Sequence, residues 1–269
     1  MAVDCGMPAL LDFRHVTVLR GDSRSGTPPA LDDVSLRIEQ GEHVCILGPN
    51  GCGKSTLIKT ITRELYPLQG EGTFVSILGR ERWDIFELRN FLGVVSPDAL
   101  ACDAGEVTGR DIVISGFFSS ARVFPHHRPL AEHIRLAEEA LSRLGIAHLA
   151  ERPLAQMSSG EAKRTMIARA LAHKPETLLL DEPSNALDIA AQFQLRDTLR
   201  ELAKSGLAIV LVTHHVSEII PEIERVILLK NGRIVADGEK GVIVTSRNLT
   251  ELFGVPVKVA SRDGYFDIS

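Results

Sequence analysis

Alternating and continuous apolar patterns divide the chain into two kinds of predicted strand. Residues 10–19 and 31–38 alternate apolar with polar side chains, which predicts strands that bury one face. Residues 43–47, 177–180 and 207–212 are instead continuous apolar runs, which are typical of strands buried on both faces of a parallel sheet. The pattern therefore predicts an α/β fold with a mainly parallel core sheet and an antiparallel N-terminal β portion.

The middle of the chain has a different pattern. Short strands are expected at residues 73–77 and 92–95, with a helix over residues 84–91 between them that Asp84 caps. Residues 96–157 lack strand signals over most of their length. Apolar residues at helical spacing in 109–118 and 130–144 predict helices there. We therefore expect a helical subdomain at about residues 97–160, inserted between strands of the core.

The end of the chain returns to strands and then changes again. Residues 225–237 predict a hairpin around Asn231-Gly232, because this dipeptide favours a type I′ turn. A short helix is expected near residues 248–253. We assign one domain to residues 8–240 and a C-terminal extension to residues 241–269.

A glycine-rich segment follows the apolar run at 43–47 and precedes a helix-like run. Its spacing, G-x-x-x-x-G-K-S, is that of a phosphate-binding loop in the strand–loop–helix context that such a loop requires. The glycines let successive N–H groups point at an anion, and the N-terminus of the following helix adds partial positive charge. Lysine at the seventh position reaches the β- and γ-phosphates, and the serine hydroxyl after it can ligate Mg²⁺. The predicted nucleotide-binding residues of this loop are Gly48, Pro49, Asn50, Gly51, Cys52, Gly53, Lys54, Ser55 and Thr56.

Two carboxylates end the apolar run at 177–180. Asp181 can hold Mg²⁺ beside Ser55, and Glu182 can act as a general base on a water molecule. Upstream, Met157-Ser158-Ser159-Gly160-Glu161 forms a second helix entry of small residues, which can bind an anion through its N–H groups. An ordinary acidic turn is the alternative for the carboxylates, and the phosphate-binding loop upstream disfavours it. An ordinary serine cap is the alternative for residues 157–161, whose value as a motif lies in their position about a score of residues before the carboxylate strand.

Composition narrows the class of protein. The chain has 269 residues, a net charge of −5 and 44% hydrophobic residues, which does not indicate a broadly basic nucleic-acid-binding surface. No apolar run approaches the roughly 18 residues that span a bilayer, and the first eleven residues lack the basic region of a signal peptide. The four cysteines contain no C-x-x-C pair, which is typical of a reduced, cytoplasmic protein. The Cys52 thiol, beside Lys54 and a helix N-terminus, is expected to be the most alkylation-prone of them.

The motifs in this order resemble the ATP-binding cassette family of ATPases. Residues 157–161 resemble its signature motif, Ser184-Asn185-Ala186-Leu187-Asp188 resembles its D-loop, and Val212-Thr213-His214 resembles its switch histidine segment. The resemblance covers roughly residues 10 to 240. Residues 82–85, 93–96 and 113–118 further resemble the molybdate-type and photorepair-type ATP-binding proteins, which is a weaker similarity.

This resemblance implies a P-loop ATPase that hydrolyses ATP with Mg²⁺ as a head-to-tail homodimer. Ser158 and Gly160 would then contact the γ-phosphate bound by the other subunit. Glu182 and His214 would be catalytic; His215 is adjacent, and the strand register favours His214. Asp181 and Ser55 would hold the metal.

Two positions depart from the family pattern. Arg20 stands where the family places an aromatic residue that stacks on adenine; its guanidinium can stack in the same way, or it is a solvated arginine. Ser96-Pro97-Asp98 stands where the family has a glutamine that contacts Mg²⁺. Asp98 either supplies a substitute ligand or the contact is missing.

The resemblance leaves two functions open. The first is the ATPase subunit of an ABC transporter that powers separate permease chains at the cytoplasmic face, with no membrane insertion of its own. The second is a soluble cassette ATPase of repair, translation or regulation without a permease. Both use the same catalytic residues. A single cassette favours the transporter, and the photorepair-type similarity favours the alternative.

Overall fold

Strands that bury one face form the first sheet. β1 (Leu11–Val18) pairs antiparallel with β2 (Leu31–Ile38) and with β4 (Phe74–Ile77), in the order β2-β1-β4. In β2, Leu36 and Ile38 are buried and Arg37 between them is exposed. The antiparallel N-terminal portion predicted from alternation is therefore confirmed.

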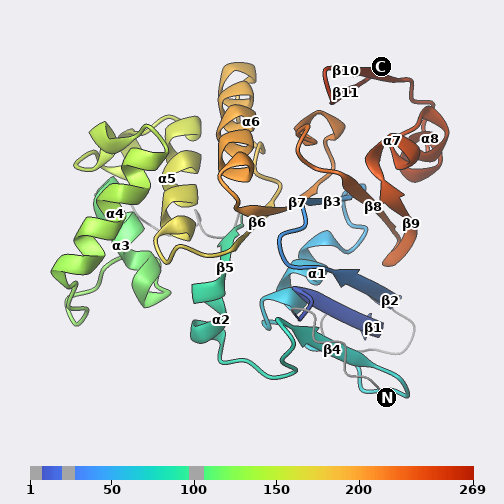
Figure 1. Ribbon diagram of the computed structural model, residues 1–269, viewed down its shortest axis with the longest axis horizontal. Helices are drawn as coiled ribbons and strands as arrows, with labels where there is room; N and C mark the ends of the chain where they lie inside the picture. Colours follow the sequence, from blue (N-terminus) through green and yellow to red (C-terminus); the bar gives the residue numbers. More distant parts are fainter. Residues whose placement is uncertain (1–7, 20–27, 97–105) are drawn as a thin grey trace. The chain divides into compact units, whose positions relative to one another are not determined.

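The structure, a computed structural model, describes residues 8–19, 28–96 and 106–269. It divides into two units, one of residues 1–85 and 210–269 and the other of residues 86–209. Figure 1 shows the elements in chain order. Among the described helices, none is long and apolar enough to cross a membrane.

Fully buried parallel strands form the core of the first unit. β3 (Val44–Leu47) pairs in parallel with β7 (Ala208–Thr213), which begins at the unit boundary, and with β8 (Arg225–Lys230). β9 (Arg233–Glu239) pairs antiparallel with β8. Asn231 and Gly232 between β8 and β9 have φ values of 49° and 77°, as a type I′ turn requires. α1 (Lys54–Ile61) follows β3 after the glycine-rich loop.

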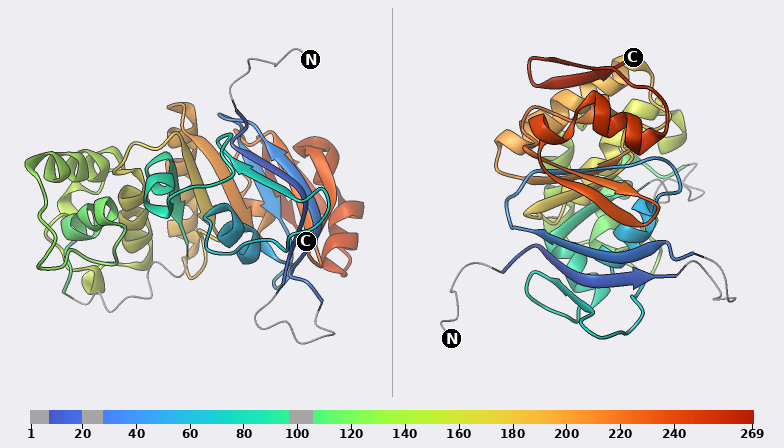
Figure 2. Two further views of the ribbon diagram at one scale, coloured as in Figure 1. Left: turned by 90° about the horizontal axis from the view of Figure 1, so that it is seen from below. Right: turned by 90° about the vertical axis from the view of Figure 1, so that its right-hand side faces the viewer.

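The second unit is mostly helical. α3 (Gly109–Ser115), α4 (Ala131–Arg143) and α5 (Ser159–Leu171) pack against one another (Figure 2). α2 (Ile85–Phe91) leads into β5 (Leu92–Val95), which pairs in parallel with β6 (Thr177–Asp181); α6 (Ile189–Lys204) follows β6. Single 3₁₀ turns connect these elements at η2 (Gly116–Phe118), η3 (Ala147–Leu149) and η4 (Leu154–Gln156). The helical spacing of residues 109–118 therefore corresponds to an α-helix that tightens into a 3₁₀ turn.

The C-terminal extension has more structure than the sequence predicts. α7 (Lys240–Ile243) and α8 (Ser246–Phe253) follow β9. Thr245 caps α8 by accepting a hydrogen bond from Asn248 N–H. β10 (Val259–Arg262) and β11 (Tyr265–Ile268) then form a hairpin that the apolar pattern does not reveal.

Candidate functional site

The phosphate-binding loop is formed by residues 48–53 between β3 and α1. Its entry is fixed to the end of β7, because Gly48 N–H donates to the carbonyl oxygen of Thr213 at 3.1 Å. Its exit is fixed to the β8–β9 turn, because Gly232 N–H donates to the carbonyl oxygen of Cys52 at 2.8 Å. Gly51 and Gly53 have φ values of 79° and 115°, which other residues rarely adopt. The loop conformation is thus held at both ends by backbone hydrogen bonds.

Glycine is also needed for close approach of the loop to its neighbours. A Cβ on Gly48 would lie 2.3 Å from the carbonyl oxygen of Leu229, and one on Gly53 would lie 2.4 Å from that of Ala30. The Gly48 position also lies against the Cys52 sulfur, at 2.6 Å from such a Cβ. Cys52 is only 3% exposed, so its burial counts against the expectation that it is the most alkylation-prone cysteine, while Cys5 and Cys102 lie outside the described residues. Alkylation of Cys52 requires the loop to open.

The Lys54 ammonium group is buried at the end of the loop, whereas Ser55 next to it is exposed. Lys54 is buried, and its Nζ donates to the carbonyl oxygens of Gly48 at 2.8 Å and Pro49 at 3.1 Å. The ammonium therefore lies over the loop. Ser55 is exposed in the first turn of α1, where N–H groups are not used by the helix. The lysine, the serine hydroxyl and the helix N-terminus are groups that can bind a polyphosphate.

Histidines follow the end of β7 in the same unit. The ring centroids of His214 and His215 are 3.9 Å apart, and His215 N–H donates to Thr213 Oγ1 at 2.9 Å. His214 is half-buried and His215 is exposed. Since Thr213 also accepts the hydrogen bond from Gly48, the strand end that carries His214 is bonded directly to the phosphate-binding loop. The sequence did not indicate this role of Thr213, which only the pairing of β3 with β7 reveals.

The acidic strand end lies in the second unit. Asp181 ends β6 and is 5% exposed, while the half-buried Glu182 has a φ of 44°. This left-handed conformation is strained for a glutamate and turns the chain sharply after the strand. Asn185 Nδ2 donates to Glu182 Oε2, and Asn185 N–H donates to the Glu182 carbonyl oxygen at 3.2 Å. Asn185 thus orients the Glu182 carboxylate, a role that the sequence analysis did not assign.

The signature segment begins α5 in the same unit. Ser158 Oγ accepts a hydrogen bond from Glu161 N–H at 3.3 Å, and Ser158 N–H donates to Glu161 Oε2 at 2.8 Å. This is a capping box. The Ser158 N–H and the Ser158 hydroxyl, at 2.9 Å, both donate to Glu161 Oε2, and these two bonds, with Arg152 nearby, lower the pKa of Glu161 below its usual value. A Cβ on Gly160 would lie 2.9 Å from Ala191 Cβ at the start of α6, so the small residue permits close helix packing.

The predicted site residues thus fall into two groups. The first unit contains the phosphate-binding loop, Lys54, Ser55 and His214, and the second contains Asp181, Glu182, Ser158 and Gly160. Arg20 and Asp98 lie outside the described residues. Within the described ranges, no group of three or more histidine, cysteine, aspartate or glutamate side chains is arranged to hold a metal ion.

Comparison with known proteins gives the family. Residues 31–185 match the family model described as ABC transporter. The chain belongs to the ABC transporter family. It is 31% identical over 268 residues to the hemin import ATP-binding protein HmuV of Bradyrhizobium diazoefficiens, covering 96% of this chain and 93% of that protein.

Solved structures agree with this assignment. An inward-facing putative metal-chelate type ABC transporter is similar with a TM-score of 0.77 and 25% identity, over 97% of this chain and 96% of that chain. A dimeric ATP-binding cassette in a post-hydrolysis state with ADP and Pi is similar with a TM-score of 0.69 and 28% identity, over 85% of this chain and 98% of that chain. The P-loop fold expected from the sequence is confirmed, and the chain is the ATP-hydrolysing subunit of an ABC transporter.

Proposed function

We propose that this chain is a Mg²⁺-dependent ATPase that dimerises head-to-tail around two ATP molecules and powers an importer of a metal complex. The observation that carries the proposal is the phosphate-binding loop, held by Thr213 and Gly232 with Lys54 folded over it. The similarity to a hemin import protein and to a metal-chelate type transporter supports a metal complex as the class of transported substrate. The permease chains would be separate, and the ATPase would lie on the side of the membrane that supplies ATP.

In this proposal the loop N–H groups and the N-terminus of α1 bind the ATP phosphates. Lys54 leaves the carbonyl oxygens of Gly48 and Pro49 and reaches the β- and γ-phosphates. Arg20 would stack on adenine. These contacts position the γ-phosphoryl group and neutralise its charge, which supplies most of the catalysis in phosphoryl transfer.

Ser55 and Asp181 each offer a hard oxygen ligand of the kind that Mg²⁺ prefers, and Asp98 would add another. When bound, the ion neutralises charge on the β- and γ-phosphate oxygens. Phosphate oxygens and water would complete its coordination, since Mg²⁺ usually takes only one or two carboxylates from a protein.

Glu182 would take the proton from the attacking water, and Asn185 would hold its carboxylate in the required orientation. His214 would donate a hydrogen bond to the γ-phosphate. In the dimer, Ser158 and Gly160 of one subunit would bind the γ-phosphate held by the other. The capping box leaves the exposed Ser158 at the N-terminus of α5, where an anion is favoured.

The Glu182→Gln variant tests the proposal. The amide keeps the shape but not the base, so ATP should bind while turnover falls by about 10²-fold or more. Unhydrolysed ATP should then hold a dimer, which light scattering with and without ATP measures. Glu176→Gln, an exposed residue just before the same strand, is the matched control and should hydrolyse ATP normally.

Ser158→Arg should abolish the ATP-dependent dimer of Glu182→Gln without loss of ATP binding, because bulk and charge would block the contact between subunits. A Glu182→Gln protein that remains monomeric with saturating ATP would argue against the autonomous dimer. A Glu182→Gln protein that turns over at the wild-type rate would exclude Glu182 as the base.

A further inference from the structure

The C-terminal extension contacts the segment that follows the switch histidine. In the first unit, His214 is followed by the 3₁₀ turn η5 (Val216–Glu218) and then by Pro221. β11 packs against η5. Lys240, at the start of α7, donates from Nζ to the carbonyl oxygen of Pro221 at 2.5 Å. The chain after β9 therefore contacts the segment that follows His214 at two places, η5 and Pro221.

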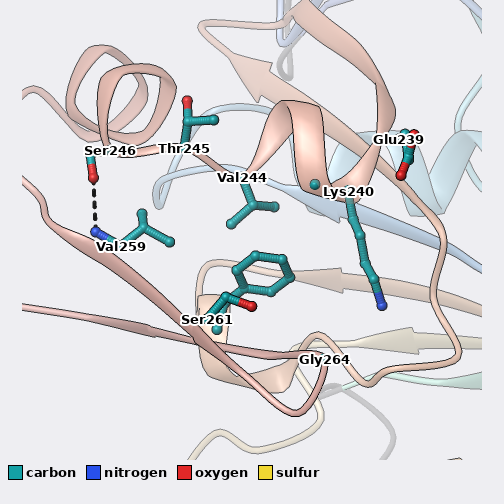
Figure 3. A pocket seen from close by; sticks show the side chains of 10 residues that line it. Glu239, Lys240, Val244, Thr245, Ser246, Val259, Ser261 and Gly264 are labelled. Atoms are coloured by element: carbon teal, nitrogen blue, oxygen red, sulfur yellow. Dashed lines mark hydrogen bonds between the residues drawn. The ribbon is translucent and has the colours of Figure 1, made fainter.

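A second contact holds Pro221 from the hairpin. Asp263 and Gly264 have φ values of 53° and 81° and form the tight turn between β10 and β11. A Cβ on Gly264 would lie 3.0 Å from Pro221 Cβ. Pro221 is thus contacted by the Lys240 ammonium and by the hairpin turn. Figure 3 shows Lys240 extending its side chain in the direction of Gly264.

The segment from His214 to Ile223, which includes Pro221, is suited to transmit a displacement. Glu218 N–H donates to the His215 carbonyl oxygen at 3.2 Å, and Ile223 N–H donates to that of Ile220 at 3.1 Å. Its apolar side chains Val216, Ile219, Ile220 and Ile223 are at most 1% exposed. Close-packed elements of this kind move as a whole rather than deform locally. At the other end, Thr213 is fixed by the pairing of β7 with β3.

A cavity lies between the β10–β11 hairpin and the helices α7 and α8, next to Lys240. This cavity of about 480 Å³ separates α7 and the start of α8 from the hairpin, and Lys240, Val244, Val259 and Phe266 contribute to its lining (Figure 3). Across it, Val259 N–H donates to Ser246 Oγ at 3.0 Å. Because the hairpin does not fill this space, hydrogen bonds supplement packing here: the bond between Val259 and Ser246 attaches the hairpin to α8, and the bond from Lys240 attaches α7 to Pro221.

We propose that Lys240, together with the hairpin turn at Gly264, is a positioning residue for ATP hydrolysis that holds Pro221 and thereby sets the placement of His214. The inference rests on the proposed role of His214. Burial lowers the pKa of Lys240, and the negative charges of Glu222 and Glu224 partly offset this lowering. Lys240 touches neither the phosphate-binding loop nor, in this role, the nucleotide; it acts through the chain segment.

Substitution of Lys240 tests this role. Lys240→Met keeps the aliphatic chain but removes the donor, and should lower kcat roughly three- to tenfold with KM for ATP unchanged, as expected when one hydrogen bond that orients a catalytic group is lost. Lys240→Arg keeps a donor and should restore most of the rate. Lys258→Met, at an exposed lysine next to the same hairpin, is the control and should match the wild type.

Two further measurements separate positioning from general stability. The Cε1–H NMR resonances of His214 and His215 should shift in Lys240→Met and not in Lys258→Met. Gly264→Asn tolerates the left-handed φ and places a Cβ against Pro221, so it should perturb the same resonances and lower kcat in the same direction.

The outcomes distinguish this inference from the proposed function. If His214→Ala abolishes turnover while Lys240→Met and Gly264→Asn keep wild-type kcat, the positioning role is wrong and the proposed function stands. If Lys240→Met acts through KM, or Lys258→Met loses as much activity, the positioning role is likewise wrong. If His214→Ala turns over normally, the role of His214 fails and the inference fails with it.

Discussion

The paired substitutions Gly48→Ala and Gly51→Ala separate two reasons for glycine in the phosphate-binding loop. A Cβ at position 48 would lie 2.3 Å from the Leu229 carbonyl oxygen, whereas one at position 51 has no atom within 4 Å. Leu229 belongs to β8 and pairs with Ile234 of β9, so moving its carbonyl group aside would disturb the sheet. Because heavy atoms rarely approach within about 3.0 Å of a Cβ, the loop must shift by at least about 0.7 Å in close-packed surroundings.

That shift sets the expected loss of activity. A displacement of about 1 Å in a positioning element can lower the rate about 10²-fold, so Gly48→Ala should lose ATPase kcat/KM on that scale. At position 51 the φ of 79° penalises alanine by about 1–2 kcal/mol in stability without a steric clash. Gly51→Ala should therefore unfold at a lower temperature but bind ATP with an affinity closer to that of the wild type.

Thermal unfolding without nucleotide and titration with a fluorescent ATP analogue measure the two effects. Steady-state ATPase assays complete the comparison. If Gly48→Ala binds and hydrolyses ATP as the wild type does, or if Gly51→Ala loses more affinity than Gly48→Ala, the assignment of loop geometry to the contact with β8 is refuted.

Two other predictions concern acidification and the adenine contact. Burial lowers the pKa of His173 below its ordinary value of 6.5, so the unfolded chain binds a proton more readily and the stability from the neutral imidazole is lost as the pH falls below 6.5. His173→Gln, which can still donate to the Gly116 carbonyl oxygen, should show a smaller drop in Tm between pH 7.5 and pH 5.5 than the wild type. The control His148→Gln, at an exposed histidine, should show the same drop as the wild type. Equal drops in all three proteins would contradict this prediction. Arg20→Ala should weaken ATP-analogue binding by about 0.5 to 2 kcal/mol, with Arg20→Tyr restoring it, and unchanged affinity would make Arg20 a plain surface residue.

The sequence predicted those features that depend on local pattern. The apolar runs at β3, β6 and β7 revealed the core strands because each strand is buried along its whole length. The phosphate-binding loop followed from the spacing of Gly48, Gly53 and Lys54. In each case the signal lies within one short segment.

Features that depend on contacts between distant segments could not be predicted from the sequence. The Cys52 thiol was judged from its helix N-terminus and Lys54, but its burial comes with the close approach of the loop to β8 and β9, far along the chain. The hairpin β10–β11 was missed because three of the four residues of β10 are exposed, so apolar alternation is weak. The Asp263-Gly264 dipeptide was the available signal for it.

The left-handed backbone at Glu182 has an evolutionary consequence. A glutamate there is held against its own conformational preference, and glycine or asparagine would adopt the same φ with less strain. If Glu182 is the base proposed above, selection for activity opposes such a replacement, and a descendant that no longer needed turnover would gain stability from it. Retention of glutamate at this position in a relative would therefore mark a cassette that still hydrolyses ATP, and its replacement by glycine or asparagine would mark one that has kept the fold and lost the reaction.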